Sequence, residues 1–585
     1  MNDRGIVARI IFIILLLSLS WMVLIGMLAY LQLGNHKNIR YTYTSKTLGM
    51  RGTIYDRNGT KYPMAASMNA WRIFLNPREF SPSNDVPAIS RILGEKLGIP
   101  AREIEEKFSR VNAKYIKLGD TADRETYEWV RTNKMTHGVG ADQIIVRRYP
   151  HGRCMSHVLG YVNAEGVGGE GIEQRYNRYL TGTGGLIMGE KNAHRDEIFM
   201  RRQTSVDARA GHNIHLTLDH SIQEIVEKVL AETVSKFNAA HGWSMVQEVK
   251  SGELLAMASY PNYAPEQFKG LSDDVRRNYA LTTVYEPGSI MKAVSVAAWL
   301  NEGLGTPATL VNAEQGAWSY GGSILHDHVT GPIDITTAIK KSSNIVTAKL
   351  ALQLGDNRLY RYFRAFNFGS KFGFDLPGES RGMLPNPKNP RAWSKLTPTR
   401  ISIGQGVAVT ALQMISAYSC IANDGAMMKP YLISKVVSEE GEVVYQNTPE
   451  VIGRPISKKT ARQMQKMLAT VTSEMGGTGR RARIRGYSVA GKTGTSQKVE
   501  NGQYSKEKHY ASFVGFVPAG NPVFTVLVSI DQPSPQHTGG YVAAPAFSAI
   551  AEKVARYLEV PPDIEEDYPD VHEEEVDEAG FQPAM

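Results

Sequence analysis

The distribution of apolar and polar residues identifies one segment near the start of the chain as a membrane helix. Residues 10–35 contain no charged side chain and are dominated by Ile, Leu and Met. A helix crosses the hydrocarbon core of a bilayer with about 20 residues, whereas the apolar core of a cleaved signal peptide has about 7–15. The pattern therefore favours an uncleaved transmembrane anchor over residues 10–35, preceded by a short N-terminal segment at 1–9.

Downstream of the anchor, up to about residue 208, short extended runs are mixed with segments of helical periodicity. This mixture predicts a region of both helices and strands, and none of its residue patterns is typical of a catalytic site. The predicted helices are 86–108 and 123–133, and the predicted extended runs are 161–163 and 186–188.

From about residue 209 the pattern predicts strands at both ends of a domain, with helices between them. A first group of strands is followed by a mainly helical region from Ser289 to Ala422, after which strands return. This order predicts one sheet that is assembled from both ends of the domain and has helices on its faces. The predicted strands are 213–218, 244–249, 254–259, 489–495, 511–517 and 523–530.

The most informative single stretch is Tyr285–Leu300. Pro287-Gly288 is typical of a turn, and the apolar run after it contains neither Gly nor Pro, so a helix should begin at or just after Gly288. Ser289 then lies in the first turn, and Lys292 projects from the same face of the helix. Since a serine hydroxyl becomes a good nucleophile only when a neighbouring base takes its proton, the pair predicts an activated serine.

Four-residue patterns of this kind also occur by chance. Ser505-Lys506-Glu507-Lys508 has the same Ser-x-x-Lys spacing, and it is predicted to lie in a hydrophilic loop. Ser289 differs because partners follow it in order. Ser342-Ser343-Asn344 lies between a predicted helix, 335–341, and an apolar run, 345–354, and Lys492-Thr493-Gly494-Thr495 follows a short strand-like segment. This ordered set is typical of the penicillin-recognising serine enzymes.

The chain as a whole resembles the class B penicillin-binding proteins, the monofunctional transpeptidases that cross-link bacterial peptidoglycan. The resemblance covers nearly the whole chain up to about residue 555. Ile403–Gln413 is more similar to the division (septal) branch of the family than to its elongation branch. The other matching stretches are Arg51–Gly59, Ser251–Ser259 and Ser512–Phe516.

The resemblance implies an α+β fold, with an antiparallel sheet beside a helical subdomain and Ser289 at their junction. It also implies that an elongated mixed pedestal of the dimerisation type precedes this catalytic domain and holds it away from the bilayer. The expected division of the chain is an anchor at 10–35, a pedestal at 36–208, a transpeptidase domain at 209–558 and an acidic disordered tail at 559–585.

By the same resemblance, Ser289 attacks the penultimate carbonyl of a stem peptide that ends in D-Ala-D-Ala, and Lys292 accepts its proton. Ser342 relays a proton to the leaving nitrogen and Asn344 orients the substrate amide. The expected substrate-binding residues are Lys492 and Thr493 for the terminal carboxylate, Gly494 for close approach of the substrate backbone, and Thr495, whose N–H forms an oxyanion hole with that of Ser289. The family implies no metal and no cofactor.

The expected partners are peptidoglycan stem peptides, β-lactams, the membrane, a glycan polymerase and membrane proteins of the division machinery. The resemblance places the catalytic domain outside the cytoplasmic membrane, with the N-terminus inside. The formal net charge is +8, although Asp563–Glu578 holds ten acidic and no basic side chains. A basic body suits an anionic membrane surface or wall polymer, and without a basic-aromatic recognition module nucleic acid is not expected.

Three alternatives stay open at this point. One is an elongation-branch transpeptidase, and another is a membrane-bound β-lactamase or β-lactam sensor, which shares the three motifs. A β-lactamase of the class A type also needs a deacylating Glu, and the nearest candidate, Glu379, lacks the Asn expected after it. The third alternative is a scaffold of the wall-synthesis complex with a vestigial site.

Two further patterns resemble binding sites but lack the surroundings that such sites need. Gly166–Gly171 fits the glycine spacing of a dinucleotide-binding turn, but the helix-like run 172–180 is short and no strand–helix alternation surrounds it. His326-Asp327-His328 resembles a metal site without a third convergent ligand, so we expect a loop there.

Overall fold

The computed structural model describes residues 3–33, 41–79, 85–110, 113–121, 123–133, 138–191, 198, 200, 202, 204–500 and 502–565. The chain divides into two compact units, of which the first comprises Met1–Leu48 and Gly184–Arg209 and the second Gly49–Thr183 and Ala210–Met585. The tail predicted at 559–585 lies, from residue 566 on, outside the described residues.

The first unit contains the apolar helix and a small sheet. Helix α1 (Asp3–Leu33) includes a stretch, Arg4–Leu33, that is long and apolar enough to cross a membrane. It begins seven residues before the predicted anchor, because Arg4 and Arg9 are also compatible with a helix. Strands β1 (Tyr41–Thr47), β6 (Gly185–Lys191) and β7 (Thr204–Val206) form an antiparallel sheet in the order β1-β6-β7.

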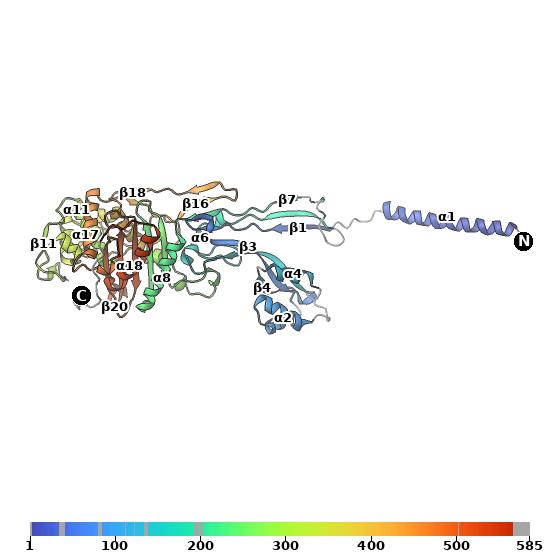
Figure 1. Cartoon of the computed structure of the whole chain (residues 1–585), viewed down its shortest axis with the longest axis horizontal. Coiled ribbons are helices and arrows are strands. Elements are labelled where there is room, and N and C mark those ends of the chain that lie inside the picture. The colour runs from blue at the N-terminus through green and yellow to red at the C-terminus, as the bar shows by residue number, and fades with distance from the viewer. Residues whose placement is uncertain are drawn as a thin grey trace. The chain divides into compact units, whose positions relative to one another are not determined.

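In the second unit, the predicted pedestal and the predicted catalytic domain share one seven-stranded sheet (Figure 1). Strand β2 (Ile54–Tyr55) pairs in parallel with β8 (Asn213–Leu216), and the other pairs are antiparallel. Three helices pack on the strands of this sheet at residues 63–75, 116–121 and 139–148: α2 (Val86–Leu97), α3 (Ala101–Phe108) and α4 (Arg124–Thr132). The remaining strands are β3 (Pro63–Leu75), β4 (Ile116–Thr121), β5 (Val139–Arg148), β16 (Ile433–Val437) and β17 (Val443–Gln446).

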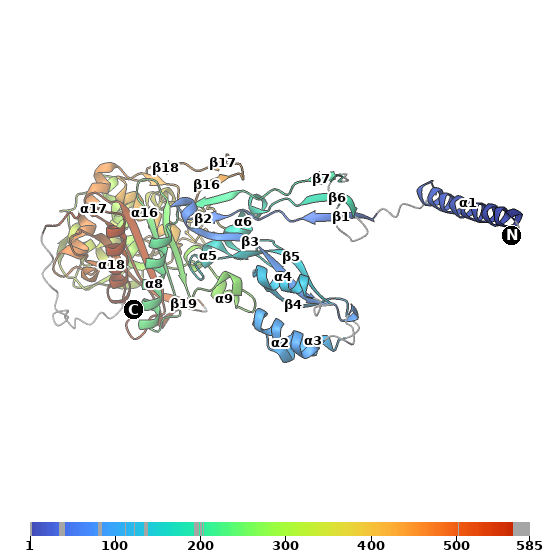
Figure 2. The same ribbon diagram turned by 45° about the vertical axis from the view of Figure 1, so that its right-hand side comes forward.

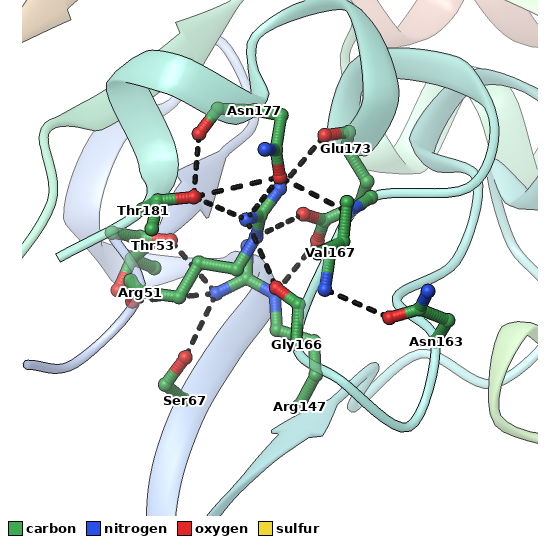
Figure 3. Close-up of polar contacts among 12 residues, drawn as sticks. Arg51, Thr53, Ser67, Arg147, Asn163, Gly166, Val167, Glu173, Asn177 and Thr181 are labelled. Atoms are coloured by element: carbon green, nitrogen blue, oxygen red, sulfur yellow. Dashed lines mark hydrogen bonds and ion pairs between the residues drawn. The ribbon is translucent and has the colours of Figure 1, made fainter. Parts of the chain in front are cut away.

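The Arg51–Gly59 stretch is held by a buried ion cluster, which Figure 3 shows. The Glu173 carboxylate accepts from Arg51 Nε at 2.5 Å and from Arg147 Nε at 2.7 Å, and its side chain is fully buried. The glycine-rich segment closes over this cluster, since a Cβ on Gly168 would lie 1.9 Å from the Glu173 carbonyl oxygen. The segment Gly166–Gly171, which fits the glycine spacing of a dinucleotide-binding turn, therefore packs against buried residues of the protein. Glu173 lies on α6 (Gly171–Arg175), beside α5 (Ser156–Leu159) and α7 (Asn177–Leu180).

The catalytic half is built on an antiparallel five-stranded sheet in the order β10-β9-β21-β20-β19. Its strands come from both ends of the domain, as the sequence predicts. Helices α8 (His220–Lys236) and α18 (Gly539–Tyr557) cover one face, and α16 (Ala411–Ala422) covers the other (Figure 2). The strands are β9 (His241–Glu248), β10 (Leu254–Tyr260), β19 (Ala490–Glu500), β20 (Gln503–Val517) and β21 (Phe524–Asp531).

A helical subdomain lies against the face covered by α16, with the buried helix α11 (Lys292–Asn301) at its centre. The region predicted as helical also contains two short strand pairs, β11 (Leu310–Asn312) with β14 (Pro332–Asp334) and β12 (Ala317–Tyr320) with β13 (Ser323–His326). A third pair joins β15 (Met427–Met428) to β18 (Val451–Gly453). The other helices are α9 (Asp273–Arg276), α10 (Tyr279–Thr282), α12 (Ile335–Lys340), α13 (Asn344–Leu354), α14 (Asp356–Ala365), α15 (Thr397–Ile401) and α17 (Lys458–Ser473).

Three local predictions need correction. The helix predicted at 86–108 is two helices, because Gly98 adopts φ +66° and Pro100 follows it. The run 172–180 is likewise divided, at Tyr176. Ser505 lies within strand β20 rather than in a loop, where its hydroxyl accepts from Lys508 N at 3.1 Å.

Candidate active site

Ser289 lies on a single 3-10 turn, Gly288–Met291, that leads directly into α11. Gly288 has φ +56° and donates its N–H to the Gly404 carbonyl at 3.1 Å. Gly404 approaches so closely that a Cβ there would lie 2.1 Å from the Gly288 oxygen. The backbone of Ser289 is therefore fixed by the Gly404 loop, and its side chain remains half-buried at the start of a buried helix.

Lys292, one turn further, is fully buried and joins two of the predicted motifs. Its Nζ donates to Asn344 Oδ1 at 2.7 Å and to the Ser342 carbonyl and hydroxyl oxygens at 2.5 and 3.1 Å. Ser289 Oγ has no hydrogen-bond partner within the described part of the chain. Catalytic hydrogen bonds are often formed only in the substrate complex, so this geometry leaves the hydroxyl available for reaction.

The turn that carries Ser342 is strained. Ser342 has φ +62°, in the left-handed region that residues other than Gly rarely adopt. Ser343 follows as the N-cap of α13, where its hydroxyl accepts from Val346 N at 3.1 Å. Asn344 Nδ2 donates to the His326 carbonyl at 3.1 Å. This strain turns Ser342 toward Lys292 and is of the kind found at functional sites.

Asp327 supports this turn, a role that we did not expect from the sequence, where it is part of a metal-like triplet. Its carboxylate accepts from Ile345 N at 3.0 Å and from the Ser343 hydroxyl. The only sequence signal available was an acidic residue upstream of a helix start, and nothing in the linear order placed it beside Ser343. Asp327 is therefore a positioning residue for the Ser342–Asn344 turn.

The third motif lies on β19, which forms the edge of the five-stranded sheet next to the Ser289 turn. Lys492 is fully buried and Thr493 donates its hydroxyl to Thr478 Oγ1 at 3.0 Å. A Cβ on Gly494 would lie 2.9 Å from the Pro287 carbonyl oxygen, so only glycine fits between strand and turn. Thr495 Oγ1 accepts from Gly539 N at 3.1 Å. The structure thus brings all eight predicted site residues to the junction of sheet and helical subdomain.

Burial sets the charge state of the two lysines. Desolvation lowers the pKa of Lys292 to about 7, although the nearby charge of Asp327 opposes this shift. Desolvation also lowers the pKa of Lys492 well below its usual value, and the charge of Lys292 lowers it further. An uncharged lysine amine is a base, so Lys292 can accept a proton near neutral pH. The repulsion disfavours two positive charges in this site.

Two further sequence candidates have other roles. The Glu379 carboxylate accepts from the backbone N–H groups of Phe372, Gly373 and Phe374 at 2.5–3.0 Å. Because those bonds occupy both of its oxygens, it holds a loop together. His326 ends strand β13, and its carbonyl orients Asn344, so the triplet expected to be a loop lies partly in a strand.

Two family models match the chain. Residues 242–552 match the penicillin-binding protein transpeptidase domain, and residues 46–216 match the penicillin-binding protein dimerisation domain. Together these two matches cover most of the chain from residue 46 to residue 552.

Curated relatives and solved structures agree with these matches. A probable peptidoglycan D,D-transpeptidase, PbpC of Pseudomonas aeruginosa, is 30% identical over 96% of this chain and 97% of its own length. The peptidoglycan D,D-transpeptidase FtsI of Escherichia coli is 30% identical over 94% of this chain and 91% of its own. The crystal structure of penicillin-binding protein 3 from Mycobacterium tuberculosis with aztreonam has a TM-score of 0.69 and 28% identity, over 89% of this chain and 98% of that one.

Proposed function

Because the chain belongs to the class B penicillin-binding proteins, we propose that it cross-links peptidoglycan stem peptides at the division septum, with Ser289 as the acylated nucleophile. The chain is a serine D,D-transpeptidase with a transpeptidase and a dimerisation domain. The observation that carries the assignment of the site is the set of bonds from Lys292 Nζ to Ser342 and Asn344, next to the free hydroxyl of Ser289.

The reaction has two steps. Ser289 Oγ attacks the penultimate carbonyl of the donor while Lys292 takes its proton, and the N–H groups of Ser289 and Thr495 stabilise the oxyanion. One oxyanion donor contributes about 10²–10³ in rate. The C–N bond then breaks, and Ser342 relays the proton held by Lys292 to the nitrogen of the departing D-Ala. In the second step the amine of a neighbouring stem peptide attacks the ester and releases Ser289.

The edge position of β19 explains how the donor is held. An edge strand presents unpaired backbone groups, to which an extended peptide can add as a further strand. Gly494 gives this peptide close access, and Lys492 with Thr493 receives its terminal carboxylate. Buried Lys492 lacks a negative charge beside it, and the terminal carboxylate of the donor supplies one. Donor binding therefore favours the protonated form of Lys492. Asn344 orients the donor amide.

The apolar helix fits a single-pass membrane anchor. We propose that the N-terminus lies inside the cytoplasmic membrane and the catalytic domain outside it, where stem peptides are found. The expected partners are a glycan polymerase and membrane proteins of the division machinery. The similarity to FtsI and the Ile403–Gln413 stretch support the septal branch over the elongation branch.

The direct test is covalent labelling with a fluorescent penicillin. The parent protein will be labelled, with the adduct on the peptide that contains Ser289, and Ser289→Ala will take up no covalent label. The matched control is Ser505→Ala, which removes the hydroxyl of the other Ser-x-x-Lys sequence and should label normally. An adduct on Ser505, or undiminished labelling of Ser289→Ala, would exclude the assignment.

The lifetime of the adduct separates the remaining alternatives. Both carboxylate oxygens of Glu379 accept hydrogen bonds from backbone N–H groups, so the structure does not support Glu379 as the base for hydrolysis. The penicilloyl adduct should therefore persist far longer than it took to form. Intact-mass spectrometry over time measures this. Rapid recovery of free protein with accumulating penicilloic acid indicates a β-lactamase, and a folded protein that is never acylated indicates a scaffold.

The pH dependence of acylation tests the roles of Lys292 and Asp327. The rate should rise with pH through about 7 and then level off, since only the uncharged amine of Lys292 is a base. Asp327 raises the pKa of Lys292, so Asp327→Asn should move the midpoint to lower pH. Stopped-flow acylation from pH 5 to 9 measures the midpoint. The control is Asp334→Asn, which removes a carboxylate charge in the same subdomain but retains an N-cap residue for α12. A midpoint that stays in place or rises in Asp327→Asn contradicts this account.

A further inference from the structure

A cavity of about 480 Å³ lies beside the strands that join the predicted pedestal to the predicted catalytic domain. Its walls come from the segment after β2, from β8, from the turn before β10 and from β16. The proposed reaction gives none of these residues a role. Cavities of about 300–1,000 Å³ are the size that small molecules occupy in proteins. The side chains that line this cavity therefore indicate which ligand it takes.

Two of the lining side chains come from neighbouring strands of the seven-stranded sheet. His215 of β8 pairs with Tyr55 of β2 on one side and with Lys435 of β16 on the other. Paired residues of adjacent strands point to the same face of a sheet. The rings of Tyr55 and His215 stack with 5.1 Å between their centres. The imidazole therefore lies between an aromatic ring and a lysine, in the wall of the cavity.

A β-bulge adds a hydroxyl group to this wall. Ile433 and Lys435 pair with the adjacent residues Leu216 and His215, so Ser434 is one extra residue in β16. Neighbours in a regular strand point to opposite faces, whereas a bulge changes the direction of the side chains around it. Here both Ser434 and Lys435 line the cavity. The bulge thus allows one strand to present a hydroxyl and an ammonium group to the same space.

The polar groups of this wall are free to bind a ligand. Within the described part of the chain, the Ser434 hydroxyl, the His215 ring nitrogens and Lys435 Nζ form no hydrogen bond or ion pair. The Thr217 hydroxyl, which also belongs to a lining residue, instead donates to the Leu254 carbonyl at 2.7 Å. Polar groups from three residues are therefore left without a protein partner at one place.

The charges around the cavity are not balanced. The charged or titratable residues among the described ones that line it are Arg57, His215, Glu253 and Lys435. The Glu253 carboxylate lies 3.5 Å from Arg57 Nη2 and also accepts from Tyr431 Oη at 3.0 Å. Burial lowers the pKa of His215, and the charge of Lys435 lowers it further. The wall thus has one more positive than negative charge, and an anion would favour a further proton on His215.

We propose that this cavity binds a phosphate ester, with its phosphate group on Ser434, Lys435 and His215. A phosphate offers three strong acceptor oxygens to donors from different strands, whereas a planar carboxylate offers two. A phosphate group alone is much smaller than the cavity, so there is also room for the group that carries it. Because Arg57 follows β2 and the other residues lie on β8 and β16, the ligand contacts both predicted domains. The proposal does not depend on the proposed function.

Isothermal titration calorimetry of the detergent-solubilised full chain with glycerol 1-phosphate tests the site. We expect saturable one-to-one binding, which Lys435→Gln should weaken about tenfold or more because it removes a charge-assisted hydrogen bond. Glu253→Gln should strengthen binding, since it removes the repelling carboxylate and releases Arg57, a gain that misfolding cannot produce. The matched control is Lys459→Gln, an exposed lysine of α17 outside the cavity. Absence of saturable binding, or equal weakening by the control, overturns the proposal.

Two other soluble probes decide the class of ligand. Glycerophosphoglycerol carries the phosphodiester of a lipid headgroup, and citrate carries carboxylates only. Tighter binding of glycerol 1-phosphate than of glycerophosphoglycerol supports a soluble phosphate monoester, and the reverse order supports a lipid headgroup. Tighter binding of citrate than of either ester overturns the assignment to phosphate.

The role of His215 is tested by the pH dependence of binding. Because a bound anion favours the charged imidazole, affinity should rise as pH falls from 8 to 6. Sulfate is the probe for this measurement, since its own charge does not change over that range. In His215→Gln the affinity for sulfate should no longer vary with pH. Affinity that is independent of pH in the parent, or an equal dependence in His215→Gln, excludes His215 from the site.

Discussion

Replacing Lys292 with alanine will slow acylation of Ser289 by about 10²–10⁴-fold, the usual cost of removing a general base. In the structure Lys292 is the buried amine one turn from Ser289, the proposed nucleophile, and burial brings the pKa of Lys292 to about 7. Without it, the Ser289 proton must leave to water or to Lys492, whose amine contacts Thr493 rather than the Ser342 turn. Rapid-quench or stopped-flow measurement of β-lactam acylation gives the rate.

Because Lys292 is fully buried, loss of packing must be separated from loss of the base. Lys292→Met keeps the aliphatic shape and should lose as much acylation as Lys292→Ala, while keeping more thermal stability. The matched control is Lys506→Ala, the lysine of the second Ser-x-x-Lys sequence, which should acylate at the parent rate. Acylation of Lys292→Ala within a few-fold of the parent would assign the proton to another group.

The order of the motifs was sufficient to predict which residues the structure brings together at the junction of the sheet and the helical subdomain. The motifs that contain Ser289, Ser342 and Lys492 are each common in sequences. They become informative because they follow one another in this order and each lies next to the helix or strand expected for it. The sheet built from both ends was also predictable, because alternating strand patterns surround a helical region. These features depend on local periodicity, which a sequence displays directly.

The supporting residues could not be predicted in the same way. Asp327, the residue that follows β13, holds the Ser342 turn, and Gly404 fixes the Ser289 turn from more than a hundred residues downstream. Both roles depend on long-range packing, which has no periodic signal. The positive φ of Ser342 was hidden for a related reason, since a strained backbone is imposed by its surroundings rather than by its own residue type.

The structural role of Arg51–Gly59, one of the stretches that carry the family resemblance, likewise becomes visible only in the three-dimensional structure. Arg51 donates to the Glu173 carboxylate and carbonyl and to Asn177 Oδ1, and Arg147 donates to the Gly52 carbonyl at 2.7 Å (Figure 3). This cluster secures the strand β2, which pairs with β8 of the catalytic half. A motif without catalytic chemistry therefore joins the predicted pedestal to the predicted catalytic domain.

Glu173→Gln should accordingly destabilise this junction by about 3–5 kcal/mol, the cost of removing one partner from a buried ion pair. Glutamine has the same shape, but it leaves the guanidinium groups of Arg51 and Arg147 buried without a countercharge. Local opening should become about 10² to about 4 × 10³ times more frequent, since each 1.4 kcal/mol is a factor of ten. Hydrogen exchange followed by mass spectrometry should show it in peptides covering residues 51–56 and 166–181.

The matched control for this prediction is Glu128→Gln on α4. Glu128 forms only exposed ion pairs with Arg124 and Arg131, which contribute at most about 1 kcal/mol. Its loss should leave exchange in the two junction peptides unchanged. Replacing Arg51, Arg147 and Glu173 together by apolar residues of similar volume should restore part of the protection, because a buried ionic cluster costs desolvation that an apolar one does not. Equal exchange in Glu173→Gln and the parent would mean that the cluster is not what holds β2 against β8.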